Sequence, residues 1–105
     1  MEVNGKEQGR NLLLELKGEL DHHGAKAAMV QIEFALDTAL PKKLVLDFAD
    51  VSFMDSSGIA VVINALRSMT QIEGKLLLTG ILPQPMRVFR ASGIDKIVEI
   101  KEAVS

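Results

Sequence analysis

The feature that most constrains the fold of this chain is a short apolar run followed closely by a longer apolar run. Residues 44–48, Leu-Val-Leu-Asp-Phe, predict a buried strand over 43–48. Because this strand is apolar on both sides, we expect it to be covered on both faces. Residues 58–69 are almost uniformly apolar as far as Leu66 and predict a largely buried helix. The polar sequence Asp55-Ser56-Ser57-Gly58 therefore lies where a strand ends and a helix begins.

Apolar residues earlier in the chain follow the same two periods. Leu12, Leu14 and Leu16 stand at every second position and predict a strand. Residues 3–6 would pair with this strand through a turn at 8–11. Apolar residues at helical spacing then predict a helix over 25–40, with Asp21 as its cap and Pro41 as its stop.

The second half of the chain continues the alternation. Its predicted features are a helix stop at Gly74, a strand over 75–79, a helix from Pro83 to Ser92-Gly93, a strand over 94–100 and a candidate helix start over 101–105. Strands that alternate with helices are typical of an α/β layer structure. We therefore predict a single α/β domain over residues 1–105, a small mixed sheet of four or five strands with helices packed on it.

Composition excludes several classes of function. The chain has a net charge of −2 and no run of Lys or Arg, so it lacks the charge pattern of a nucleic-acid-binding protein. It has no cysteine, which excludes disulfides and thiolate metal sites. The longest apolar run, residues 59–63, is too short to span a membrane, and residues 1–6 lack the apolar core of a signal peptide. We therefore expect a cytoplasmic protein that binds neither nucleic acid nor membrane.

The Asp-Ser-Ser-Gly sequence supports two interpretations. Backbone N–H groups at a helix N-terminus lack partners within the helix, so an Asp or Ser side chain commonly caps them. The same N–H groups and the helix dipole favour a bound anion, or a phosphate carried on a hydroxyl. If Asp55 is the cap, Ser56 is the first helical residue with its hydroxyl facing solvent, which favours Ser56 over Ser57 for modification. Gly58 in the first turn would permit close packing.

Three other groups of residues could suggest chemistry. His22 and His23 are adjacent, but neighbouring helical side chains point about 100° apart and no third metal ligand is evident. A surface role for this pair at a partner interface, or simple solvation, fits better. A Ser-His-Asp hydrolase would need one of these histidines beside Ser56, yet the chain has no G-x-S-x-G and no glycine-rich nucleotide motif. We expect no catalytic residue, no metal and no cofactor. Arg87 and Arg90 are assigned to the solvated face of their helix, with an anion contact left open.

Two separated motifs resemble those of a known family. Asp55-Ser56-Ser57-Gly58, after an apolar strand and before an apolar helix, resembles the signature of STAS-domain anti-sigma factor antagonists of the stage II sporulation protein AA type. Gly18-Glu19-Leu20-Asp21-His22-His23 resembles the other hallmark of that family. The two motifs have the order and spacing found in the family, and the similarity covers roughly residues 10–100.

The resemblance implies a non-enzymatic regulator that is controlled by phosphorylation. In that family the serine directly after the Asp is phosphorylated, which maps to Ser56. The unphosphorylated form would bind an anti-sigma factor that is also a serine kinase, and a sigma factor would thereby be released. The kinase would hold ATP and magnesium, and a PP2C-type phosphatase would remove the phosphate. The implied partner-binding residues are Asp21, His22, His23, Gly24, Asp55, Ser56, Ser57 and Gly58.

A second interpretation keeps the fold but assigns the chain to a different regulatory system. STAS domains also serve as non-enzymatic interaction modules in stress-signalling complexes, transporters and lipid-trafficking systems. The intact Asp-Ser-Ser-Gly sequence and a free-standing chain favour the antagonist, and we expect it to be a monomer. Because strands followed by helices place their functional turns along one edge of the sheet, we expect binding to centre on the start of the second helix, with residues 21–24 beside it.

Overall fold

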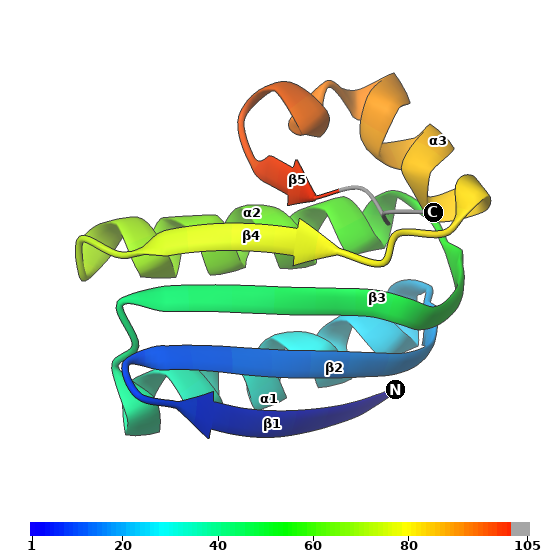
Figure 1. Cartoon of the computed structure of the whole chain (residues 1–105). Helices are drawn as coiled ribbons and strands as arrows, with labels where there is room; N and C mark the ends of the chain where they lie inside the picture. The colour runs from blue at the N-terminus through cyan, green and yellow to red at the C-terminus, as the bar shows by residue number, and fades with distance from the viewer. Residues whose placement is uncertain (102–105) are drawn as a thin grey trace.

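Five strands form one mixed sheet, and their order in space follows their order in the chain (Figure 1). The structure is a computed structural model and describes residues 1–101. The strands are β1 (Glu2–Gln8), β2 (Asn11–Leu20), β3 (Lys43–Met54), β4 (Lys75–Thr79) and β5 (Glu99–Lys101). β1 and β2 are antiparallel, whereas β2, β3, β4 and β5 run parallel. This arrangement confirms the predicted α/β class and the mixed sheet.

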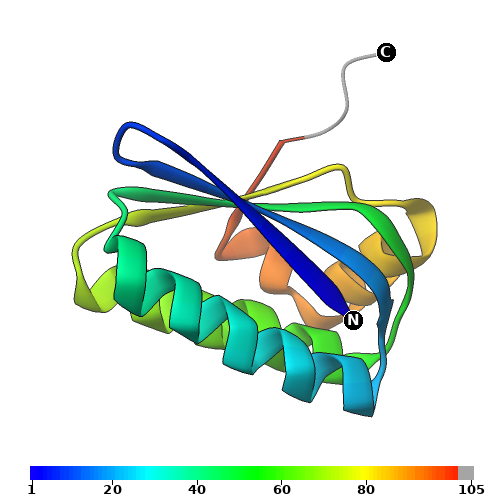
Figure 2. The ribbon, with the colours of Figure 1, turned by 90° about the horizontal axis from the view of Figure 1, so that it is seen from below.

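The helices lie together on one face of the sheet (Figure 2). They are α1 (His22–Ala39), α2 (Ser56–Gln71), α3 (Pro83–Ser92) and the short 3-10 helix η1 (Ile94–Lys96). Because these helices share one face, the sheet has one covered and one open face along most of its length. Within residues 1–101, no helix combines the length and the apolar character needed to cross a membrane.

The open face corrects the expectation that β3 is covered on both sides. Leu44 and Leu46 are fully buried, whereas Val45 between them points to the other face and is only half-buried. Val45 lies beside Leu13 of β2 and Leu77 of β4 in the register of the sheet. Its apolar side chain is therefore explained by cross-strand packing and not by a second layer of helices.

α2 is less buried than its sequence suggests. Its buried residues are Gly58, Val61, Val62, Ala65 and Met69, which share one side of the helix. Ile63, on the outer side, is 38% exposed. Within the described residues no second layer covers α2, so a nearly uniform apolar run forms a helix that is buried on one side only.

The core lies between the sheet and the helices. The leucines predicted to share one face of β2, Leu12, Leu14 and Leu16, are all buried. Phe48 of β3 and Phe89 of α3 are fully buried, and their rings meet edge to face with centroids 5.5 Å apart. This aromatic pair holds α3 against the sheet beside β3.

Element ends differ from the predictions at several places. β3 continues beyond Phe48 to Met54 because it remains paired with β2 as far as Leu20. α2 begins at Ser56, two positions before the predicted start, and ends at Gln71. Glu73, rather than Gly74, has the left-handed backbone (φ 57°) after α2.

The final strand is shorter than predicted. Gly93 has a φ of 81° and ends α3, as expected from Ser92-Gly93. Ile94 then begins η1 with its side chain buried, so residues 94–98 do not belong to a strand. Glu99–Lys101 alone reaches β4, where Leu77 is the partner of Glu99. Lys101 therefore ends a strand, and the rest of the candidate helix start at 101–105 lies outside the described residues.

Candidate functional site at the N-termini of α1 and α2

Two aspartates cap the two helices that carry the predicted site. The Oδ1 atom of Asp21 accepts the N–H of Gly24 at 2.8 Å, and Asp21 is the N-cap of α1. The Oδ1 atom of Asp55 accepts the N–H of Ser57, also at 2.8 Å, and Asp55 is the N-cap of α2. Both carboxylates therefore satisfy N–H groups that have no partner within their helices. The cap at Asp21 was predicted, and at the second helix the structure selects Asp55 from the Asp and Ser candidates.

The two capped N-termini lie side by side at one end of the sheet. Leu20, the last residue of β2, pairs with Met54, the last residue of β3. The N–H of Asp55 donates to the carbonyl of Leu20 at 3.3 Å, so a backbone hydrogen bond joins one cap to the residue before the other. Figure 1 shows that β2, β3 and β4 end where α1, α2 and α3 begin. The parallel strands thus bring together two motifs that lie more than thirty residues apart in the chain.

The two serines of the motif differ in exposure. Ser56 is exposed and is the first residue of α2, whereas Ser57 is half-buried and donates its N–H to Asp55. The Ser56 side chain makes no hydrogen bond within residues 1–101. An exposed hydroxyl at a helix N-terminus is open to an approaching partner, and a phosphate placed there would meet the positive end of the helix dipole.

Gly58 and Gly24 contribute space to the site. A Cβ atom at Gly58 would overlap the Cγ and Sδ atoms of Met54, whose side chain is fully buried below the first turn of α2. A Cβ atom at Gly24 would overlap the carbonyl oxygen of Glu19. Both glycines are buried, so they bring the helices close to the strands and offer little surface to a partner themselves.

The histidine pair lies at the surface beside Asp21. His22 and His23 are both exposed, and their rings meet at 65° with centroids 5.9 Å apart. No group of three or more His, Cys, Asp or Glu side chains is placed to hold a metal ion in the part of the chain that the structure describes. Over the same residues, neither histidine shares a hydrogen bond with Ser56. The pair therefore belongs to the exposed surface of the site.

The match to a family model covers almost the whole chain. The model of the STAS domain matches residues 2–105. The chain belongs to the STAS domain family. The family predicted from the two motifs is thereby confirmed.

Curated relatives of this STAS domain carry the name of one kind of regulator. An anti-sigma F factor antagonist of Paenibacillus polymyxa is 32% identical over 89 residues, which are 85% of this chain and 76% of the relative. An anti-sigma-B factor antagonist of Listeria monocytogenes is 33% identical over 87 residues, or 80% of this chain and 73% of the relative. These names describe regulators that act on other proteins.

Solved structures agree with the sequence comparison. The unphosphorylated form of the anti-sigma factor antagonist SpoIIAA matches this STAS domain with a TM-score of 0.82 and 27% identity, over 99% of this chain and 90% of that one. The phosphorylated form of SpoIIAA from Bacillus matches with a TM-score of 0.74 and 27% identity, over 99% and 93% of the two chains. The predicted STAS fold is therefore confirmed.

The sequence prediction missed one residue at the base of the site. The side chain of Gln84, the second residue of α3, forms two hydrogen bonds with the backbone of Met54. The N–H of Met54 donates to Oε1 at 2.9 Å, and Nε2 donates to the carbonyl of Met54 at 2.8 Å. Nothing in the local sequence around Gln84 signals this contact, because its partner is thirty residues away and is a backbone group.

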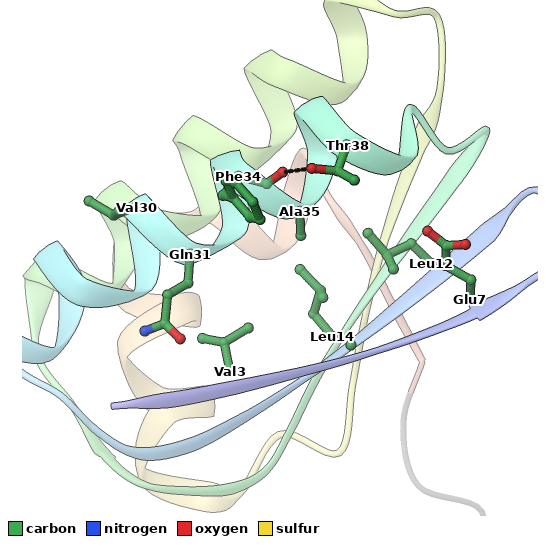
Figure 3. A pocket seen from close by; sticks show the side chains of 10 residues that line it. Val3, Glu7, Leu12, Leu14, Val30, Gln31, Phe34, Ala35 and Thr38 are labelled. Atoms are coloured by element: carbon green, nitrogen blue, oxygen red, sulfur yellow. Dashed lines mark hydrogen bonds between the residues drawn. The ribbon is translucent and has the colours of Figure 1, made fainter.

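A separate groove lies between α1 and the β1–β2 hairpin of this STAS domain (Figure 3). Its volume is about 600 Å³, and Leu12 and Leu14 line it from β2. On α1, Val30 and Phe34 border it and are 72% and 74% exposed. None of the predicted site residues lines the groove, so it is distinct from the surface around Ser56.

Proposed function

We propose that this STAS domain is an anti-sigma factor antagonist that is switched off by phosphorylation of Ser56. The unphosphorylated form binds an anti-sigma factor, and a sigma factor is released as a result. The observation that carries the proposal is the exposed hydroxyl of Ser56, the first residue of α2 and the neighbour of the Asp55 cap. Relatives named antagonists of anti-sigma F and anti-sigma-B factors support it, as does the likeness to SpoIIAA in its two phosphorylation states.

The partners follow from this function. The anti-sigma factor is also a serine kinase, and it holds the ATP and magnesium that phosphoryl transfer requires. A PP2C-type phosphatase removes the phosphate from Ser56 and resets the switch. The chain is a substrate and a binding partner, not a catalyst. It acts as a monomer in the cytoplasm, where sigma factors meet RNA polymerase.

The surface around Ser56 supplies the contact with the anti-sigma factor. The proposed contact residues come from the two adjacent N-termini: Asp21, His22, His23, Asp55, Ser56 and Ser57. The buried Gly24 and Gly58 support this surface by letting the helices lie close to the strands. A phosphate on Ser56 adds roughly −1.5 to −2 charges at neutral pH. A partner surface fitted to a neutral hydroxyl would then face a hydrated dianion beside the carboxylate of Asp55. Like charges across an interface can cost several kcal/mol, which corresponds to a loss of affinity of about 10²- to 10³-fold.

The test is phosphorylation by the anti-sigma factor encoded in the same organism. The purified chain is incubated with that kinase and magnesium ATP, and mass spectrometry locates the phosphate. We expect a single phosphate on Ser56, none in Ser56→Ala, and a normal amount in Ser52→Ala, an exposed serine of β3. Phosphate on Ser57 alone would contradict the proposal.

Binding measurements complete the test. Ser56→Ala should bind the anti-sigma factor like the parent chain because it keeps a small neutral side chain. Ser56→Asp should bind at least about tenfold more weakly because its carboxylate imitates part of the phosphate charge. Equal binding by the parent chain, Ser56→Ala and Ser56→Asp would show that the interface lies elsewhere.

A further inference from the structure

Gln84 occupies an unusual place at the end of β3. The strand pairs with β4 only as far as Asp47, whose partner is Thr79. Residues 48–54 continue along β2, and among residues 1–101 no strand pairs with their other side. At Met54, the last residue of β3, the carboxamide of Gln84 supplies one donor and one acceptor to the backbone. It replaces the hydrogen bonds that a neighbouring strand would have made.

We call these two hydrogen bonds the Gln84 clamp. Both are short, at 2.8 and 2.9 Å, and both engage buried or half-buried groups. Only a neutral carboxamide of this length offers a donor and an acceptor together, because a Glu side chain of equal length lacks the donor at neutral pH. The clamp therefore depends on the identity of residue 84.

The clamp acts directly below the serine. The Met54 side chain is fully buried against the first turn of α2, where it leaves no room for a Cβ at Gly58. The Met54 backbone is held by Gln84, and the next residue, Asp55, is held by Leu20 and caps α2. Met54 is thus fixed through both its side chain and its backbone, and Ser56 follows two residues later.

We propose that Gln84 is a positioning residue that fixes residues 54–57 and so sets the place of the Ser56 hydroxyl for the partner kinase. The proposal rests on the proposed function of Ser56 as the phosphorylated residue. Gln84 does not touch the serine, and its effect passes through Met54 and Asp55. Because Gln84 is the second residue of α3, the clamp also joins the start of α3 to the end of β3, two residues before α2.

The consequence for phosphoryl transfer is one of geometry. The acceptor hydroxyl must lie in line with the γ-phosphate of the ATP that the kinase holds, and small displacements of a reacting group lower the rate steeply. Gln84 is half-buried and is not among the proposed contact residues. Loss of the clamp should therefore lower kcat for phosphorylation of Ser56 and change KM little.

The main test variant is Gln84→Met, which keeps the length of the side chain and removes both polar atoms. Gln71→Met is the matched control, because Gln71 is exposed at the other end of α2. Hydrogen exchange followed by NMR needs no partner. We expect the amide of Met54 to exchange at least about tenfold faster in Gln84→Met, with the amides of residues 55–57 shifted. The amide of Leu46, in the middle of β3, should be unchanged.

Steady-state phosphorylation by the partner kinase gives the second measurement, well below the melting temperature of each variant. We expect kcat to fall roughly tenfold or more in Gln84→Met with KM within twofold, and no change in Gln71→Met. Gln84→Glu keeps the acceptor and loses the donor, so it should lie between the parent chain and Gln84→Met in amide exchange. It also serves as the test if Gln84→Met does not fold.

Several results would overturn the proposal. If the Met54 amide of Gln84→Met exchanges within twofold of the rate in the parent chain, the clamp does not stabilise the backbone at Met54. Faster exchange with an unchanged kcat would show that the clamp serves stability alone. If the parent chain itself accepted no phosphate on Ser56, the proposed function would fail, and amide exchange would still decide whether Gln84 fixes residues 54–57.

Discussion

At the scale of single residues, Gly58 tolerates a side chain poorly because the first turn of α2 lies directly on Met54. Gly58→Val would place a branched side chain where Met54 already lies, and overpacking of this kind costs about 1–3 kcal/mol of stability. The first turn of α2 would move away from β3, so binding of the anti-sigma factor should weaken as well. Denaturant unfolding and a binding titration measure the two effects.

The control for this prediction lies in the same helix. Ala60 is exposed two residues later, and Ala60→Val adds the same branched group without meeting the core. It should change stability by less than about 0.5 kcal/mol. If Gly58→Val has the same stability and the same affinity for the anti-sigma factor as Ala60→Val, Gly58 is not required for the structure of the site.

Ser56 itself permits a prediction about stability. A phosphate at a helix N-terminus is favoured by roughly 0.3–1 kcal/mol when exposed, and repulsion from Asp55 offsets part of this gain. The fold should therefore change little, and the melting temperature of the phosphorylated chain should stay within a few degrees of the parent. Calorimetry of both forms at low and high salt is the measurement. A phosphorylated form that melts far earlier would mean that the switch acts by unfolding.

At the scale of elements, a carboxylate joins the two helices that carry the site. The Oε1 atom of Glu33 in α1 accepts hydrogen bonds from Asn64 Nδ2 at 3.0 Å and from Ser68 Oγ at 2.7 Å, both in α2. Glu33→Ala removes both bonds and should destabilise the chain by about 1 kcal/mol. For a domain of this size, that lowers the melting temperature by about 4–8 °C. Thermal unfolding measures it.

Two variants separate this contact from a general effect of charge. Glu33→Gln keeps an oxygen that can accept, so it should lose less stability than Glu33→Ala. Asp37 is exposed one turn further along α1, and Asp37→Ala removes a carboxylate of the same sign without a cross-helix partner. If Asp37→Ala and Glu33→Ala lower the melting temperature equally, the two hydrogen bonds contribute nothing specific.

The elements also show which signals in the sequence are strong. The cap at Asp21 was predicted correctly, and Asp55 was one of the two kinds of cap considered for α2, because a cap acts on neighbours two or three residues away. The length of β3 was not predicted correctly, because residues 49–54 carry several exposed side chains and owe their extended form to pairing with β2. Of the two irregularities in that pairing, the one after Gly18 coincides with a glycine at a φ of 124°, and glycine within a strand often marks a bulge. The irregularity between Glu15 and Lys17 has no such sign in the sequence.

At the scale of the whole molecule, the sequence identifies the exposed residues of the candidate site more readily than the residues that hold them in position. The exposed members, His22, His23 and Ser56, belong to motifs that are continuous in the chain. Gln84 holds the site from another helix, and a glutamine in the first turn of a helix has no distinctive pattern. The one-sided sheet was missed for a similar reason, since the apolar side chain of Val45 is satisfied by strands on either side and not by helices.

The order of the strands has a consequence for how the molecule is made. Because every strand pairs with its neighbour in the chain, no later strand must enter between two that are already joined. A chain that leaves the ribosome at roughly 5–20 residues per second could add each strand to the growing edge as it emerges. Both capped helix starts would exist before α3 has been synthesised. Gln84 is the last of the residues that build the site to appear, so the serine would gain its final position only after the start of α3 has been synthesised.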